Sequence, residues 1–342
     1  MSKHTPRPLR RLAQISFWLI ALVFALVAVT AIYGAIATAN ERTRFPPPGH
    51  LVDVGGHRLH LRCEGQGSPT VVLESGNGMT SNEWTLVQPE VAKFTRVCSY
   101  DRAGLGWSES GPPADPVEVL HTLLRNGAVF GPYAIVGHSY GTGLARRFAY
   151  RFPNAVTGMV LAAASYPDEE VQQIAAGTSA QDSRYMEIFA WSTRLGLLRI
   201  TPEKYLPEML RVYFGALRQF LPPKAAESEI AFLHQTRHVQ AFAMERGRPA
   251  QQEEAEDVTA CSRGFGGIPL VVLSEKWVYS RDADEREKEA ARREAERQVR
   301  LAGLSSRGKQ IDLESGHLIP LESPSAVVDA VRRVVFTARS LQ

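Results

Sequence analysis

Short apolar runs recur along the chain from about residue 51 onward, and segments with helical spacing of apolar positions separate most of them. The runs are almost continuously apolar, which is typical of strands buried on both faces of a sheet. They occupy residues 51–54, 58–61, 70–73, 96–100, 134–136, 158–162, 269–273 and 309–313. Buried strands that alternate with helices predict an α/β protein with a mainly parallel sheet flanked by helices. Gly55-Gly56 predicts a tight turn between the first two strands.

The N-terminal part of the chain has a different pattern. Residues 15–39 carry no formal charge and consist mostly of Leu, Ile, Val, Ala and Phe. At ~1.5 Å rise per residue such a helix crosses a hydrocarbon layer of ~30 Å. Basic residues lie in the first 14 positions, so the positive-inside rule keeps residues 1–14 cytoplasmic and places the rest outside the cytoplasm. We expect a transmembrane signal-anchor; the alternative is a secreted protein cleaved near Ala39.

The remaining sequence divides into a core with one insertion. Residues 40–50 contain Pro46-Pro47-Pro48 and predict a stiff linker. Residues 51–167 and 263–342 are expected to form the two parts of the core. Between them, residues 168–262 are rich in aromatics and prolines with helical spacing, which predicts a helical cap over a pocket. The run 281–300, rich in Glu, Arg and Ala, predicts a solvent-facing helix.

Composition excludes several classes of protein. The 342 residues are 44% hydrophobic and 22% charged, which indicates a globular protein. The net charge of only +3 gives no sign of a basic surface that binds nucleic acid. The three cysteines are widely spaced, so neither a zinc site nor a disulfide-dependent fold is predicted. His234 and His238 have a helical i, i+4 spacing but lack a third ligand nearby, so no metal is expected. No phosphate-binding or dinucleotide motif is present, and we predict no cofactor.

The chemistry is indicated by Gly137-His138-Ser139-Tyr140-Gly141, which fits G-x-S-x-G between an apolar run and an amphipathic run. Small residues at such a junction permit a sharp turn that exposes the serine. A histidine, His317, follows the last apolar run, and a glycine-rich bend at residues 75–78 follows the run at 70–73. The order of these pieces predicts a serine nucleophile, a histidine base and an oxyanion hole.

These motifs resemble the α/β-hydrolase fold, serine-nucleophile branch. The resemblance covers about residues 51–335 apart from the variable middle, and rests on residues 73–78, 100–108, 137–141 and 315–317. It implies that Ser139 is the nucleophile, His317 the general base, and the backbone amides of Tyr140 and Asn77 the oxyanion hole. The stretch from Asp101 to Ser108 corresponds to a loop beside the cleft, for which we expect a bracing role.

Several residues are candidates for the acid of the triad. In this fold it usually follows the penultimate strand, where Asp282, Asp284 and Glu275 are candidates. We favour Asp282, although its spacing also fits a helix cap. Some relatives carry the acid after the preceding strand in a Leu-Val-Asp ending, but this chain reads Leu161-Ala162-Ala163, which leaves Asp168 as a weaker substitute.

The sequence therefore predicts an esterase- or lipase-like serine hydrolase that cleaves a carboxylic ester or related acyl bond of a modest apolar substrate. Peptidase, amidase, thioesterase and C–C hydrolase activities remain open. A serine at the elbow argues against the aspartate-nucleophile chemistry of dehalogenases and epoxide hydrolases. The alternatives are a catalytically silent binding protein of the same fold and a cofactor-free perhydrolase. The expected partners are a small acyl substrate and, through residues 15–39, a membrane.

Overall fold

Eight strands form one sheet in the order β1-β2-β4-β3-β5-β6-β7-β8. The computed structural model describes residues 7–341 except 165, 168–185, 248–249 and 276–283. The strands β3 to β8 run parallel, whereas β2 is antiparallel to both β1 and β4. Each predicted apolar run corresponds to a strand, within one residue at its ends: β1 (His50–Asp53), β2 (Arg58–Glu64), β3 (Thr70–Glu74), β4 (Val97–Tyr100), β5 (Tyr133–His138), β6 (Val156–Ala162), β7 (Leu270–Glu275) and β8 (Gly308–Leu313). The predicted mainly parallel α/β sheet is confirmed.

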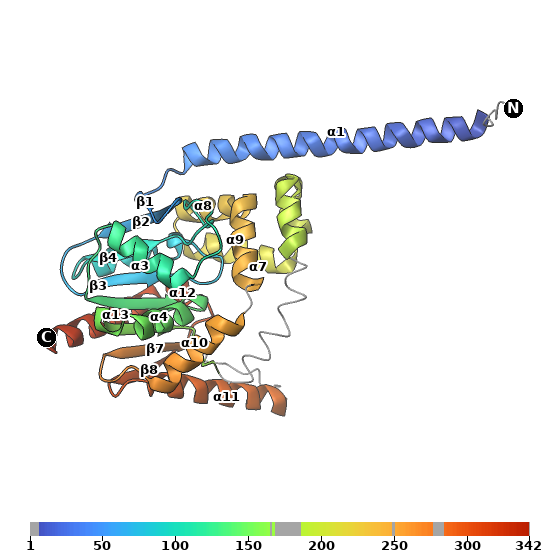
Figure 1. Cartoon of the computed structure of the whole chain (residues 1–342). Helices are drawn as coiled ribbons and strands as arrows, with labels where there is room; N and C mark the ends of the chain where they lie inside the picture. The colour runs from blue at the N-terminus through green and yellow to red at the C-terminus, as the bar shows by residue number, and fades with distance from the viewer. Residues whose placement is uncertain (1–6, 165, 168–185, 248–249, 276–283, 342) are drawn as a thin grey trace.

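Helices cover both faces of this sheet (Figure 1). On one face α3 (Pro116–Asn126), α4 (Tyr140–Arg151) and α11 (Glu285–Ala302) share a core with the strands. On the other face α2 (Gln88–Ala92) and α13 (Pro324–Ser340) do the same. The sheet is buried on both sides, which explains why its strands are apolar without alternation.

The insertion between β6 and β7 is helical where it is described. It contains residues 186–194, α6 (Leu197–Ile200), α7 (Glu208–Phe220), α8 (Pro223–Leu233), α9 (Thr236–Gly247) and α10 (Ala250–Arg263). Helix α10 packs on α4, where Arg146 forms a buried ion pair with Asp257 at 2.5 Å. Helices α8 and α9 contact the loop that follows β3. We therefore propose that α7 to α9 form the cap and that α10 belongs to the core.

The N-terminal segment is one helix, α1 (Arg7–Arg44), which projects beyond the rest of the molecule (Figure 1). The helical stretch of residues 11–44 is long and apolar enough to cross a membrane. The helix also contacts the insertion: Thr30 Oγ1 donates a hydrogen bond of 2.7 Å to the Leu195 carbonyl, and Arg199 forms an ion pair with Glu41. The long apolar helix is as predicted.

The structure contains a disulfide that the sequence analysis did not favour. Cys63 and Cys98 form a disulfide between β2 and β4, where the two residues lie opposite each other in the register. The pairing depends on two strands that meet only in the folded sheet, so the spacing of the cysteines gave no sign of it. Cys261 in α10 is free and buried.

Candidate active site

Ser139 lies at the turn between β5 and α4, at the carboxyl edge of the parallel strands. Its backbone has a positive φ of 49° with a ψ of −118°, a combination that residues with a side chain rarely adopt. A Cβ on Gly137 would come within 2.5 Å of the Gly141 carbonyl oxygen, and a Cβ on Gly141 would lie 2.4 Å from the Glu74 carbonyl oxygen. Both glycines are therefore required by close backbone approach, and the strained turn holds the serine in place.

His317 lies beside this serine. It belongs to the loop between β8 and α12 (Ile319–Glu322). Its Nε2 is 3.0 Å from Ser139 Oγ, and its Nδ1 is 3.5 Å from Oε1 of Glu275. Glu275 is the last residue of β7. The carboxyl ends of parallel strands share one edge of a sheet, so residues far apart in sequence meet there.

The four predicted acids are placed differently. Glu275 contacts His317, whereas Asp284 Oδ1 accepts a hydrogen bond of 2.8 Å from the Arg286 backbone N–H at the start of α11. Asp282 and Asp168 lie outside the described residues. Within the described part of the chain, Glu275 is the predicted acid that the fold brings to His317.

The predicted oxyanion hole lies where two elements meet. Tyr140 is the first residue of α4, and Asn77 belongs to the loop after β3. Glu245 of α9 holds this loop, because its Oε2 accepts hydrogen bonds from Gly78 N at 2.9 Å and from Asn77 Nδ2 at 3.1 Å. The backbone donors assigned to Tyr140 and Asn77 remain a prediction.

A buried pair, Glu83 and His138, links three parts of the site and was not anticipated. Glu83 accepts a hydrogen bond from Gly76 N at 2.9 Å and forms an ion pair with His138 Nδ1 at 2.5 Å. His138 Nε2 lies 2.8 Å from the carbonyl oxygen of His317. Because a carbonyl only accepts hydrogen bonds, the contact with His317 requires a proton on Nε2, and the carboxylate of Glu83 beside Nδ1 favours the charged ring.

Electrostatics agree with a charged His138. Burial acts to lower the pKa of His138, but the charge of Glu83 and the hydrogen bond to it outweigh burial, so the pKa is raised. The pair thus fixes the glycine-rich loop, the elbow and the histidine loop relative to one another. His138 occupies the variable position of the serine motif, which was its only sequence signal, and Glu83 had none.

Arg102 is the centre of a second buried cluster. Its guanidinium forms ion pairs with Glu74 at 2.8 Å and Glu245 at 2.6 Å, and Glu74 accepts a short hydrogen bond from Tyr100. It also donates to the carbonyl of Ser75 at 2.8 Å and to that of Gly76 at 2.7 Å. Burial raises the pKa of Glu74, while the charge of Arg102 opposes that rise.

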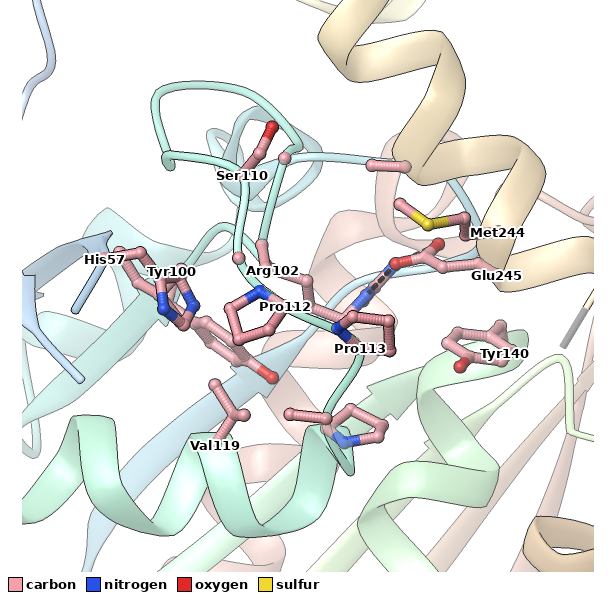
Figure 2. A pocket seen from close by; sticks show the side chains of 17 residues that line it. His57, Tyr100, Arg102, Ser110, Pro112, Pro113, Val119, Tyr140, Met244 and Glu245 are labelled. Carbon is pink, nitrogen blue, oxygen red and sulfur yellow. Dashed lines mark hydrogen bonds and ion pairs between the residues drawn. The ribbon is translucent and has the colours of Figure 1, made fainter. Parts of the chain in front are cut away.

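This cluster borders a pocket next to the serine turn. Figure 2 shows Arg102 and Glu245 joined across it, with Tyr140 and Met244 on one side. The rest of the lining is largely apolar and includes Pro113. The pocket therefore lies beside Tyr140, which follows the candidate nucleophile in sequence.

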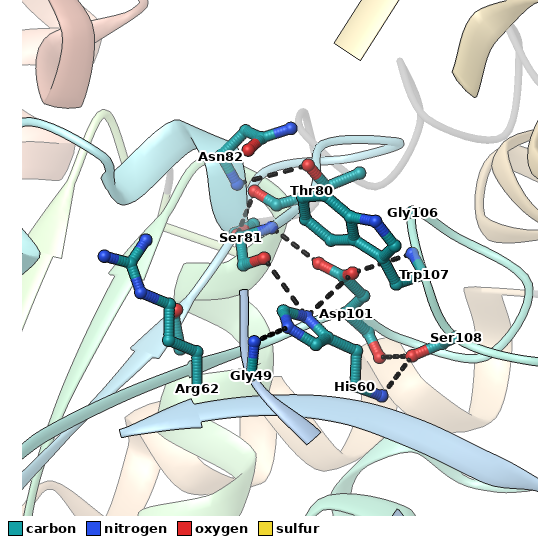
Figure 3. A network of polar contacts seen from close by, with 12 residues as sticks. Gly49, His60, Arg62, Thr80, Ser81, Asn82, Asp101, Gly106, Trp107 and Ser108 are labelled. Carbon is teal, nitrogen blue, oxygen red and sulfur yellow. Dashed lines mark hydrogen bonds and ion pairs between the residues drawn. The ribbon is translucent and has the colours of Figure 1, made fainter. Parts of the chain in front are cut away.

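Asp101 braces the loop from residue 101 to 108 (Figure 3). Its carboxylate accepts hydrogen bonds from the backbone N–H of Ser81 at 2.7 Å and of Trp107 at 2.9 Å, and it contacts His60 Nδ1 at 3.1 Å. His60 Nε2 accepts a hydrogen bond from Gly49 N at 3.2 Å. Both ring nitrogens of His60 thus have hydrogen-bond partners, and His60 and Asp101 are fully buried. The Asp101–His60 pair therefore has a structural role.

Glu229 of α8 connects the cap to the loop after β3. It accepts hydrogen bonds from Thr80 N at 3.3 Å, from Asn82 Nδ2 at 3.0 Å and from the Thr80 hydroxyl. Burial raises the pKa of Glu229 to about 7 from an ordinary value of 4.5. The folded protein therefore keeps this proton over a pH range in which the unfolded chain has lost it.

Glu229→Gln is expected to change how stability depends on pH. In the wild type, the free energy of unfolding falls by about 3 kcal/mol as the pH rises from about 4.5 to about 7, because only the unfolded chain ionises readily there. Glutamine cannot ionise, so the Tm of the variant relative to wild type should rise between about pH 5 and about pH 8. A Tm difference that stays constant over this range would contradict the assignment.

The described residues contain no group of three or more His, Cys, Asp or Glu side chains arranged to hold a metal ion. His238 is buried in α9, with its Nδ1 accepting a hydrogen bond of 3.2 Å from Gly106 N, and burial lowers its pKa to about 3. The geometry at His238 is that of a packed histidine.

Comparisons with known proteins agree with this architecture. The 2-hydroxymuconate semialdehyde hydrolase of Pseudomonas sp. (strain CF600) is 34% identical over 170 residues, which are 46% of this chain and 59% of that protein. The protein YbdG of Bacillus subtilis (strain 168) is 24% identical over 216 residues, which are 61% of this chain and 66% of that protein. The chain thus spans less than two thirds of the length of these curated relatives.

Solved structures show the same fold. A candidate epoxide hydrolase of Pseudomonas aeruginosa superposes with a TM-score of 0.63 at 19% identity, covering 86% of this chain and 98% of that one. A candidate acyltransferase of Salmonella enterica superposes with a TM-score of 0.57 at 18% identity, again over 86% and 98%. The model of the Alpha/beta hydrolase family matches residues 71–330, which is most of the chain. The chain therefore belongs to the alpha/beta hydrolase family.

Proposed function

We propose that this protein is a serine hydrolase that cleaves a carboxylic ester or related acyl bond through an acyl-enzyme. The observation that carries the proposal is the 3.0 Å separation of Ser139 Oγ and His317 Nε2 at a strained turn. A serine hydroxyl is a poor nucleophile until a neighbouring base takes its proton, and this separation is within hydrogen-bond reach.

The reaction proceeds in two halves. His317 Nε2 takes the hydroxyl proton while Ser139 Oγ bonds to the carbonyl carbon, and the resulting oxyanion is held by the backbone N–H groups of Tyr140 and Asn77. Loss of one such donor typically costs on the order of 3 kcal/mol of barrier. His317 then protonates the leaving alcohol, and the acyl group stays on the serine. In the second half a water, deprotonated by His317, releases the acid and restores the serine.

Glu275 is our choice for the acid that orients His317. The choice rests on its 3.5 Å contact with His317 Nδ1 and on its place at the carboxyl end of β7. A carboxylate at Nδ1 keeps the proton there, leaves Nε2 free to act as base, and stabilises the imidazolium that forms. Asp282 and Asp168 remain open as alternatives, whereas the helix-cap bond of Asp284 disfavours it.

Glu275→Gln is expected to lower kcat by about a thousandfold or more, because an amide stabilises neither the required tautomer nor the imidazolium. The matched variant Asp284→Asn should retain wild-type kcat. Steady-state kinetics on one ester measure both. If Asp282→Asn abolishes activity while Glu275→Gln does not, Asp282 is the acid.

A second reaction class deserves a parallel assay. The relative from Pseudomonas sp. that is 34% identical is named as a 2-hydroxymuconate semialdehyde hydrolase, a C–C bond hydrolase. The same serine and histidine serve that chemistry when the acyl–carbon bond of an activated ketone is broken. We rank it second because the match covers only 46% of this chain.

Substrate panels with the full chain in detergent separate the candidates. We expect p-nitrophenyl esters of short to medium acyl chains to be hydrolysed by the wild type and not by Ser139→Ala. Turnover of 2-hydroxymuconate semialdehyde without ester turnover would select the C–C hydrolase. A folded wild type inactive on every panel would favour the binding protein, and turnover that requires peroxide would favour the perhydrolase.

We also propose that α1 is a retained anchor and that the hydrolase body lies outside the cytoplasm. The hydrogen bond from Thr30 to the Leu195 carbonyl supports retention, since cleavage near Ala39 removes Thr30 and its contact. The Cys63–Cys98 disulfide supports an oxidising compartment.

A further inference from the structure

Several large apolar side chains are exposed beside the anchor helix. Ile188 is 68% exposed, Trp191 58% and Ile200 52%, and all three lie within the helical segment 186–200. Single exposed apolar residues are ordinary on a protein surface, but several in one short segment indicate a surface with a partner. Glu187 is the one acid in this segment.

Contacts with α1 fix where this segment lies. Thr30 Oγ1 donates to the Leu195 carbonyl at 2.7 Å, and a Cβ on Gly34 would lie 3.3 Å from the Gly196 Cα. About 20 residues cross a hydrocarbon core. Counted from the start of the apolar stretch at residue 15, the outer edge of that core falls near residue 34, so the segment lies at the bilayer surface.

The orientation of the segment fits that position. In Figure 1 the yellow-green helix at residues 186–194 runs across the direction of α1, on the side of the body toward the N-terminal end of α1. A helix that runs across a membrane-spanning helix can lie along the membrane surface. Interfacial helices use this orientation to bury apolar side chains below the headgroups.

A basic groove adjoins the segment. It has a volume of about 400 Å³ and lies between α1 and the cap, with Arg42, Arg194 and Arg237 among its lining residues. Neither Arg42 nor Arg194 forms an ion pair with a carboxylate of the described residues. Burial and then the charge of Arg42 lower the pKa of Arg237, whose guanidinium donates to the carbonyls of Gly106 and Ser108, so Arg42 and Arg237 lie close enough to repel each other. An anion at this place relieves that repulsion.

We propose that the cap is seated on the surface of the bilayer that α1 crosses, with Ile188 and Trp191 in the interfacial layer and an anionic phospholipid phosphate in the groove of Arg42, Arg194 and Arg237. Arginine binds phosphate with several donors at once, and basic residues near an anionic membrane surface are attracted to it. The proposal requires that α1 spans the membrane, but it does not depend on the hydrolase reaction.

The test uses the full chain in nanodiscs of mixed phosphatidylcholine and phosphatidylglycerol. Ile188→Cys carries an environment-sensitive fluorophore, and Phe130→Cys, a position 67% exposed before β5, is the matched control. The native cysteines do not interfere, because two form the disulfide and Cys261 is buried. A nitroxide on the lipid acyl chain is expected to quench the probe at position 188 several-fold more than the probe at 130. Equal quenching in discs that contain α1 overturns the proposal.

Charge reversal tests the phosphate site. Arg42→Glu combined with Arg194→Glu is expected to reduce the quenching at position 188 toward the level at 130. The control Arg333→Glu, an exposed arginine on α13, should leave quenching unchanged. Quenching that survives the double reversal overturns the phosphate site. Co-elution of each variant with nanodiscs confirms that α1 is inserted, so a lost anchor cannot be mistaken for a lost cap contact.

Discussion

His317→Ala is expected to lower kcat on an ester substrate by about 10⁵- to 10⁶-fold. Nucleophile and base act as one unit in such sites, and removing either typically costs about as much as removing both. The contact of Nε2 with Ser139 Oγ at 3.0 Å is the reason to expect this scale of effect here. Background-corrected kinetics of the purified variant measure it.

His50→Ala is the matched control, since His50 is an exposed histidine in β1. It should keep wild-type kcat and KM. If His317→Ala lost less than about tenfold while remaining folded, another group would have to be the base and the proposed mechanism would be wrong.

Arg102→Met is expected to lower the free energy of unfolding by about 3–5 kcal/mol, because it leaves Glu74 and Glu245 buried without their partner. The Tm should fall by about 6–10 °C. Activity should fall as well, since Arg102 holds the carbonyl groups of Ser75 and Gly76 next to the predicted oxyanion hole.

Arg218→Met provides the comparison. Arg218 forms two hydrogen bonds to Glu203, at 2.8 and 2.9 Å, but both side chains are largely exposed. Exposed pairs contribute little because water screens them, so the Tm should hardly change. Equal losses in the two variants would contradict the role assigned to the buried cluster.

The sheet could be predicted from sequence because each strand is buried on both faces, which makes its whole length apolar. The serine turn and the order of Ser139 and His317 could also be predicted from sequence, because each residue lies in a short motif that directly follows an apolar run. Glu275 could not be selected over Asp282, because the choice depends on which side chain reaches His317 from the end of β7. That is a matter of three-dimensional placement.

Long-range pairs were the other failures of sequence reasoning. The disulfide joins Cys63 and Cys98 across antiparallel strands, and Glu83 meets His138 across 55 positions of the chain. No local pattern marks such partners, because each residue taken alone fits an ordinary strand or turn. A buried ion pair such as Glu83 and His138 can be recognised only when the fold is known, because the fold brings the two residues together.

The most direct test of the central claim is labelling of the full chain with a fluorophosphonate, followed by mass spectrometry of the modified peptide. The account predicts a covalent adduct on Ser139 in the wild type and none in His317→Ala, because the phosphorus is attacked only by an activated serine. No adduct on a folded wild type, or an adduct on another serine, would contradict the account.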